Sequence, residues 1–146
     1  ARRIKRTHRR MASVAEGLDS RSPATELHAL RIRAKHLRYV LDATEPLHAT
    51  RPHEKLVGAL KKLQTALGEC HDVHVQRGML DPIAEELGHL PDGTATLLAL
   101  GRLQARLEER ERRARKGLND HMERVAGDKA RAAVRQLTRP PAGAEP

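Results

Sequence analysis

The segment from residue 28 to residue 39 holds the side chains best suited to bind a ligand, because it repeats cations at helical spacing. Successive residues of a helix turn by about 100°, so one stripe within roughly 80° of arc gathers four of them. This stripe consists of His28, Arg31, Lys35 and Arg38. The neighbouring arc is apolar (Leu27, Leu30, Ala34, Leu37, Leu41), and Ile32 and Tyr39 close the other flank. Cations bounded by apolar residues on both sides are not purely solvated, so we expect them to line a groove between packed helices and to bind an anion.

A solvated charged face of an ordinary amphipathic helix is the alternative explanation of this stripe. Solvated faces normally mix positive and negative side chains. Only Asp42 adds a negative charge to the stripe. The single sign of the charge therefore favours an anion site, and a helical scaffold with a solvated basic face stays open as the alternative.

The composition points to the same class of partner. The formal net charge is +9, which favours a polyanion such as nucleic acid, an acidic membrane surface or inorganic polyphosphate. Residues 1–40 carry 11 Lys and Arg against 3 Asp and Glu, residues 41–100 carry 5 against 9, and residues 101–146 carry 12 against 7. The positive charge is thus concentrated at the two ends of the chain, and the stripe lies in the most basic part.

Cysteine use and hydropathy bear on the compartment. Cys70 is the only cysteine, which excludes an intrachain disulfide and fits a reducing cytoplasm. No apolar run approaches the length of a membrane span, and the basic residues at the start are not followed by the apolar run of a signal peptide. We therefore expect a cytoplasmic protein without membrane contact. Residue 1 is not Met, so the sequence could be part of a longer protein.

Apolar residues recur at helical spacing along nearly the whole chain, and capping residues, Pro and Gly divide the pattern. No segment shows sustained two-residue alternation, so a sheet is not expected. The fold class is therefore all-α: an antiparallel four-helix bundle with an additional short helix, in one domain over residues 1–138, followed by a disordered tail over 139–146. The four principal helices are expected over residues 2–17, 23–44, 50–78 and 94–126, and short helical segments over 81–88 and 128–137.

Catalytic and metal-binding motifs are weak. Cys70, His71, Asp72 and His74 offer metal-ligand types within about one helical turn, but no second cluster stands at a recognisable spacing. We expect no metal and no cofactor, and we expect His71 to hydrogen-bond Gln64 one heptad back. A Gly-rich phosphate loop, a nucleophile elbow and a zinc-protease motif are all absent from the sequence, so we expect a protein that is not an enzyme.

Two linked motifs resemble a known family. The first is His28-x-x-Arg31-x-x-x-Lys35-x-Leu37-Arg38-Tyr39, and the second, further along, is Leu60-Lys61-x-Leu63-Gln64-x-x-Leu67-Gly68-x-x-x-Asp72. Together they resemble the CHAD family, the conserved histidine α-helical domain, over residues 1 to about 80. The resemblance implies an all-helical protein that binds inorganic polyphosphate, with two bundles arranged around a basic channel. This chain resembles the C-terminal bundle, which is half of that architecture.

The resemblance also implies a set of site residues and partners. His28, Arg31, Lys35 and Arg38 become candidate polyphosphate contacts, with Lys61 as a neighbour and Arg3 and Arg10 as further basic candidates from the first helix. The expected partners are inorganic polyphosphate or another polyanion, and a second helical bundle, either the protein's own N-terminal half or a second copy. A nucleic-acid-binding helical module remains the alternative, although Tyr39 is the only aromatic side chain available for base stacking.

Overall fold

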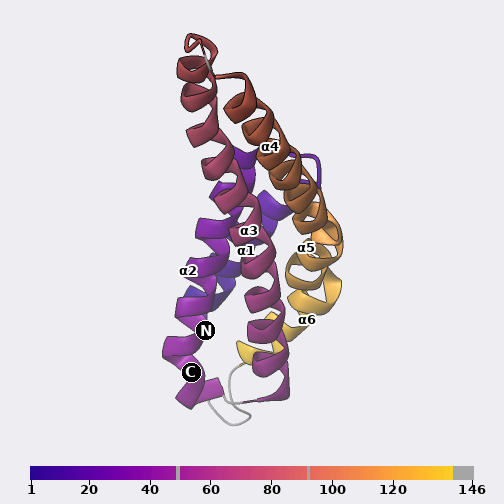
Figure 1. The fold of residues 1–146 in the computed structure, drawn as a ribbon. Coiled ribbons are helices and arrows are strands. Elements are labelled where there is room, and N and C mark those ends of the chain that lie inside the picture. Colours follow the sequence, from indigo (N-terminus) through magenta and orange to yellow (C-terminus); the bar gives the residue numbers. More distant parts are fainter. Residues whose placement is uncertain (49, 92, 140–146) are drawn as a thin grey trace.

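The regular structure of this chain is helical throughout the part that is described. The computed structural model describes residues 1–48, 50–91 and 93–139, and within these ranges it contains helices and no strand. This confirms the expected all-α class. The helices are α1 (Arg2–Glu16), α2 (Ala24–His48), α3 (Arg51–Gly88), α4 (Thr94–Arg115), α5 (Leu118–Ala126) and α6 (Asp128–Leu137), as Figure 1 shows.

The hydrophobic core lies among α1, α2, the first half of α3, α5 and α6. Leucine and other aliphatic side chains fill it, as expected for a chain without Phe or Trp. Each fully buried aliphatic side chain stabilises the fold by about 1.5–3 kcal/mol. The side chains without any exposed surface include Ile4, Met11, Leu30, Leu37, Leu41, Leu60, Leu63, Leu118 and Val125. Because Ile4 and Val125 share this core, the two ends of the described chain fold together.

The end of α3 differs from the prediction. The sequence predicted a helix ending near Gly78 and a new one at Asp81, whereas α3 continues to Gly88 with Pro82 inside it. Proline removes one helical hydrogen bond, but this half of α3 is held along its length by α4. Arg77 donates a hydrogen bond to Glu111 at 3.0 Å across that contact. Packing and ion pairing between the two helices therefore outweigh the local break signal, and α2 likewise runs through Pro46.

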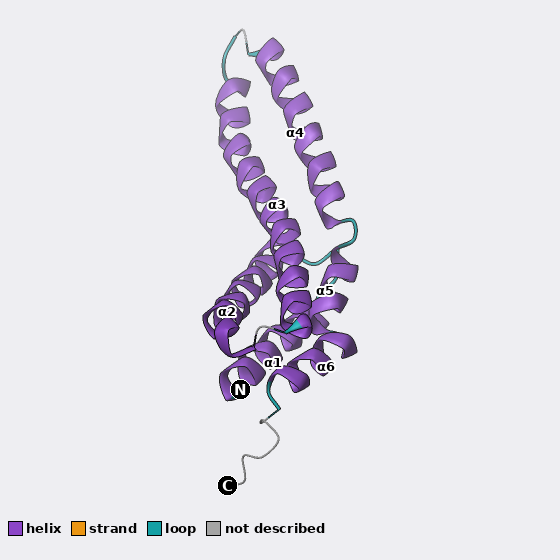
Figure 2. Cartoon of the chain, turned by 90° about the horizontal axis from the view of Figure 1, so that it is seen from below, coloured by secondary structure: helices purple, strands orange, loops and turns teal. Residues whose placement is uncertain are grey.

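The far part of the α3–α4 pair extends beyond the other helices (Figure 2). We call residues 74–88 of α3 and 94–106 of α4 the arm. Large apolar side chains of the arm remain exposed, in contrast to the core. They are Val75, Met79, Ile83, Leu98 and Leu103.

The predicted helix over 94–126 is also divided in the structure. α4 ends at Arg115 and α5 begins at Leu118, with Gly117 between them in a left-handed conformation (φ 84°) that favours glycine. Arg115 donates hydrogen bonds to the carbonyl oxygens of Ser20 and Ser22 at 3.0 and 2.7 Å, which fixes the end of α4 against the α1–α2 loop. The apolar period continues across Gly117, which is why the sequence pattern did not reveal the break.

The structure bears on the predicted tail and on membrane contact only for the residues that it describes. Residues 140–146 of the predicted disordered tail lie outside the described residues, and Arg139 is exposed. Along the described chain, every helix is too short or too polar to span a membrane.

His8 ties α1 to α5 and makes stability depend on pH. Its side chain is 4% exposed, and its Nε2 lies 2.9 Å from the carbonyl oxygen of Val125. Burial lowers the pKa of His8, and the hydrogen bond to Val125 opposes that shift more weakly. The unfolded chain therefore binds a proton below about pH 6.5 more readily than the folded chain does.

We expect the melting temperature to be constant above about pH 6.5 and to fall as the pH drops below that value. His8→Gln keeps an N–H donor near Val125 without a titrating ring. The melting temperature of this variant should therefore fall less than that of the parent as the pH drops. Thermal unfolding followed by circular dichroism between about pH 7.5 and 5 tests the prediction. Identical profiles for both proteins would contradict it.

Candidate functional site

α2 places the predicted cationic stripe at the edge of the core. Its apolar arc is buried, with Leu30, Ala34 and Leu37 at 0% exposure. On the adjoining arc His28, Arg31 and Arg38 are half-buried and Lys35 is exposed. The predicted second flank is open to solvent, however, since Ile32 and Tyr39 are 54% and 50% exposed. The stripe thus adjoins the core on one side and an exposed apolar ridge on the other.

α3 meets this stripe at two levels. The rings of His28 and His71 stack with their centroids 4.5 Å apart and an interplanar angle of 28°. One turn further along α2, the Nε of Arg31 lies 3.8 Å from the position that a Cβ on Gly68 would occupy. A long side chain at residue 68 would compete with Arg31 for this space.

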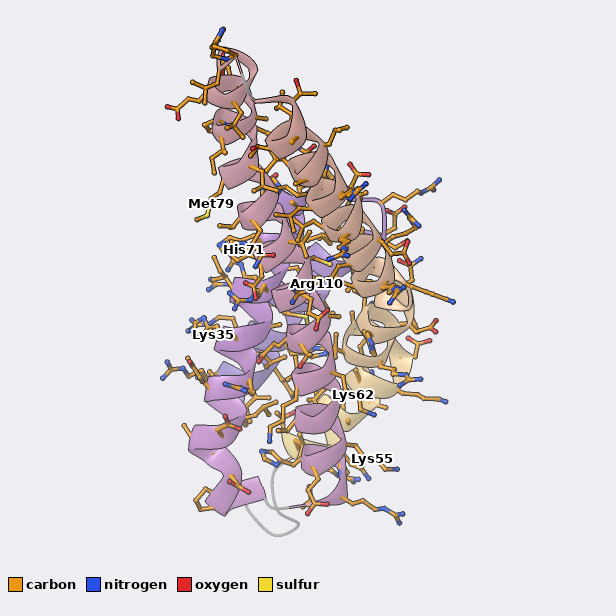
Figure 3. The ribbon with its side chains drawn as sticks, in the orientation of Figure 1. Lys35, Lys55, Lys62, His71, Met79 and Arg110 are labelled. Atoms are coloured by element: carbon orange, nitrogen blue, oxygen red, sulfur yellow. The ribbon has the colours of Figure 1, made fainter. Side chains whose placement is uncertain are left out.

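These two contacts also indicate which residues of α2 and α3 lie at the same level along the two helices. Residue numbers rise along α2 while they fall along α3, from the His28–His71 level to the Arg31–Gly68 level. Continuing the same order places Lys35 level with Gln64, and then Arg38 level with Lys61. Figure 3 shows Lys35 and His71 on the same side of the molecule. We call this set the α2–α3 face: His28, Arg31, Lys35 and Arg38 of α2 with Lys61, Gln64, Gly68 and His71 of α3.

The cations of the α2–α3 face have few counter-charges. Among the described residues, no carboxylate lies within 4 Å of Arg31, Lys35 or Lys61. The Nε of Arg38 lies 3.8 Å from Asp42 one turn along the same helix. Arg38 and Lys35 also approach the ring of Tyr39, with their charged groups 5.5 and 5.6 Å from its centroid. The face therefore carries net positive charge beside the core.

Unsatisfied polar atoms concentrate on the same face. In the described part of the chain, four buried side-chain nitrogens have no hydrogen-bond partner, and three belong to the α2–α3 face. These three are His28 Nδ1, Arg38 Nε and Gln64 Nε2. Buried polar groups in folded proteins are nearly always paired, so these three nitrogens need partners, such as water or a ligand, that the neighbouring side chains do not supply.

The structure corrects the expected role of His71. Its ring stacks on His28, whereas Gln64 Nε2, which was expected to bond it, has no partner. The stacking partner comes from α2 and was not visible in the local spacing of α3. Within the described ranges, no group of three metal-ligand side chains comes together. The thiol of Cys70 faces the core at 1% exposure, and this burial raises its pKa.

Arg3 and Arg10 lie on the side of α2 that faces α1, outside the α2–α3 face, and Arg3 adjoins it through Tyr39. Arg10 lines a cavity of about 690 Å³ together with Arg9, Ser13 and Arg33. Arg3 lines one of about 320 Å³ beside His36 and Tyr39. Arg33 and His36 were not predicted, because the helical period gives their direction around α2 but not that α1 packs on that side.

Comparison with known families supports the resemblance inferred from the motifs. The sequence model of the CHAD domain matches residues 1–81, just over half of the chain. The chain belongs to the CHAD family. The matched range covers α1, α2 and α3 as far as Asp81, and it includes every residue of the α2–α3 face. No curated protein and no solved structure gives a significant match to this CHAD chain.

Proposed function

We propose that this CHAD chain binds inorganic polyphosphate at the α2–α3 face of an antiparallel helical bundle, without catalysing a reaction. The observation that carries the proposal is the concentration of orphaned nitrogens on a face that also holds uncompensated cations. Each phosphate unit of the polymer offers one negative charge and several acceptor oxygens. Family membership supports the same ligand.

The residue types of the face suit a chain of phosphates. Arginine presents a planar fork that can bond two phosphate oxygens, as Arg31 and Arg38 would do, while Lys35 and Lys61 act as compact point charges. Half-buried cations are less screened by water, which strengthens their attraction to an anion and makes the unoccupied face electrostatically unfavourable. A polyanion would relieve this repulsion and also accept hydrogen bonds from His28 and Gln64.

Salt dependence tests the electrostatic mechanism. Four cations that displace condensed counterions predict a loss of affinity of roughly 50- to 150-fold between 50 and 200 mM salt, by analogy with other polyanions. Isothermal titration with polyphosphate of one defined length measures this slope. An affinity that is unchanged over that range would contradict the proposal. A single-stranded oligonucleotide of matched charge is the control, and equal or tighter binding of it would assign the face to nucleic acid.

A second helical bundle is part of the proposal. Val75, Met79 and Ile83 recur every four residues on α3 and are 39%, 62% and 45% exposed. They continue the side of α3 that carries His71, and Figure 3 shows Met79 and His71 on one edge of the molecule. An N-terminal half of the same protein, or a second copy, would cover this strip and add cations opposite the α2–α3 face. Light scattering during the polyphosphate titration reports the mass of the complex.

A further inference from the structure

A second positively charged site lies away from the α2–α3 face. A cavity of about 420 Å³ opens between the first turns of α3, the end of α5 and the start of α6. Lys55 lines it, and Figure 3 places Lys55 on the opposite side of the view from Lys35 and His71. None of the residues that line this cavity belongs to the α2–α3 face.

Cations from three helices converge on this cavity. They are Arg51 and Lys55 of α3, Arg124 of α5 and Lys129 of α6. No acidic side chain lines the cavity, and in the described chain none of the four cations has a carboxylate within 4 Å. Asp128, the nearest acid along α6, pairs instead with Arg131 at 3.4 Å. All four are exposed, so water and salt weaken their mutual repulsion, and an anion among them would reduce it further.

Two helix ends add to the positive potential. α3 begins at Arg51 and α6 at Asp128, and neither helix has a side-chain hydrogen bond to its cap. The positive ends of both helices therefore lie near the cations, although Glu54 and Asp128 in the same first turns offset part of that charge. Basic residues in these first turns are electrostatically unfavourable for the helices themselves. Glu54 and Asp128 offset part of this cost, and an anion held by Arg51 and Lys129 would offset more of it.

The floor of the cavity is apolar. Leu56 and Ala130 are each 3% exposed, and the other residues that line the cavity besides the cations are Pro52, Ala132, Ala133 and the polar Gln136. The alanines leave the space open, and the volume falls within the range of small-molecule sites. Inorganic phosphate would use the charged rim but not this floor. A ligand that fits both has an anionic head and a short hydrocarbon body.

We propose that this cavity binds a small amphiphilic anion, with its phosphate or carboxylate head among Arg51, Lys55, Arg124 and Lys129 and its hydrocarbon part on Leu56 and Ala133. The site is independent of polyphosphate binding because the two sets of residues do not overlap. A lipid-derived acid and a soluble organic phosphate share this chemistry, and probes with the two head groups distinguish them.

Octyl phosphate and octanoate, each below its critical micelle concentration, are the probes. Alanine methyl resonances followed by NMR should shift at Ala130 and Ala133 and saturate with at least one probe. The double variant Lys55→Glu, Lys129→Glu should weaken the binding at least tenfold, and so should Ala133→Leu, which fills the floor without changing the charge. Arg135→Glu, which reverses one charge on the same helix but outside the cavity, is the control for half of this change of charge.

Inorganic phosphate and octyltrimethylammonium separate the two halves of the ligand. Each should bind at least tenfold more weakly than the better probe, because one lacks the hydrocarbon and the other reverses the head charge. The proposal is overturned if neither octyl probe shifts Ala130 and Ala133, or if inorganic phosphate binds as well as they do. It is also overturned if Arg135→Glu weakens binding as much as the double variant. Polyphosphate affinity measured on Ala133→Leu, which changes no charge, is a separate readout and should stay within about threefold of the parent.

Discussion

Arg31→Ala should lower the affinity for polyphosphate by roughly 10- to 150-fold, measured by isothermal titration at low salt. The guanidinium of Arg31 is half-buried against Gly68 and has no acidic partner among the described residues. A hydrogen bond to a charged group contributes about 1.5–3 kcal/mol, and the alanine variant loses at least one. Arg38→Ala should have an effect of similar size, because the Nε of Arg38 has no hydrogen-bond partner.

Two variants with the same change of charge serve as controls for this prediction. Arg106→Ala removes an exposed charge from α4, and Arg33→Ala removes one from the α1 side of α2. Both should reduce the affinity by threefold or less, since they act only through the long-range field. Equal losses in all four variants would show that only the net charge matters and that the α2–α3 face is not the site.

Leu63→Ala should lower the free energy of unfolding by about 2–5 kcal/mol, because it leaves a cavity in a tightly packed core. The side chain of Leu63 is fully buried, at 0% exposure, among the helices of the bundle. This loss is a large part of the total stability of a domain, which is about 5–15 kcal/mol. Urea denaturation followed by circular dichroism measures the difference at one pH and temperature.

Leu98→Ala is the matched control, since the same side chain is truncated on the arm. Leu98 is 65% exposed, so its loss should change the free energy of unfolding by no more than about 0.5 kcal/mol. A destabilisation as large as that of Leu63→Ala would mean that the arm is covered in solution. Polyphosphate binding by Leu98→Ala should match that of the parent chain.

The sequence by itself determined the helical class and the composition of the stripe. Both depend on the 3.6-residue period, which is a local property and survives in any tertiary arrangement. The spacing of Leu30, Ala34 and Leu37 predicted the buried arc of α2, and His28, Arg31 and Arg38 followed on the adjoining arc. The two motifs also identified the CHAD family, because they combine residue type with spacing in the correct order.

Boundaries that depend on contacts between helices were wrong. Pro82 was predicted to follow a break, yet α3 continues through it because α4 packs along the same stretch. The break at Gly117 was missed, because it is fixed by Arg115 binding the carbonyl oxygens of Ser20 and Ser22, residues far away in the sequence. Propensity and periodicity are local signals worth at most about 3 kcal/mol per residue, and in these two places tertiary packing outweighs them.

Only the tertiary structure decided which candidate residues share a surface. His71 stacks on His28 and Gly68 admits Arg31, while Arg3 and Arg10 lie on the α1 side of α2. The cavity around Lys55 and Lys129 likewise joins residues from α3, α5 and α6 that no single segment brings together. A helical period fixes the direction of each side chain around its own helix axis. The side chain that it meets depends on how the helices pack, and that is set by the burial of the whole core.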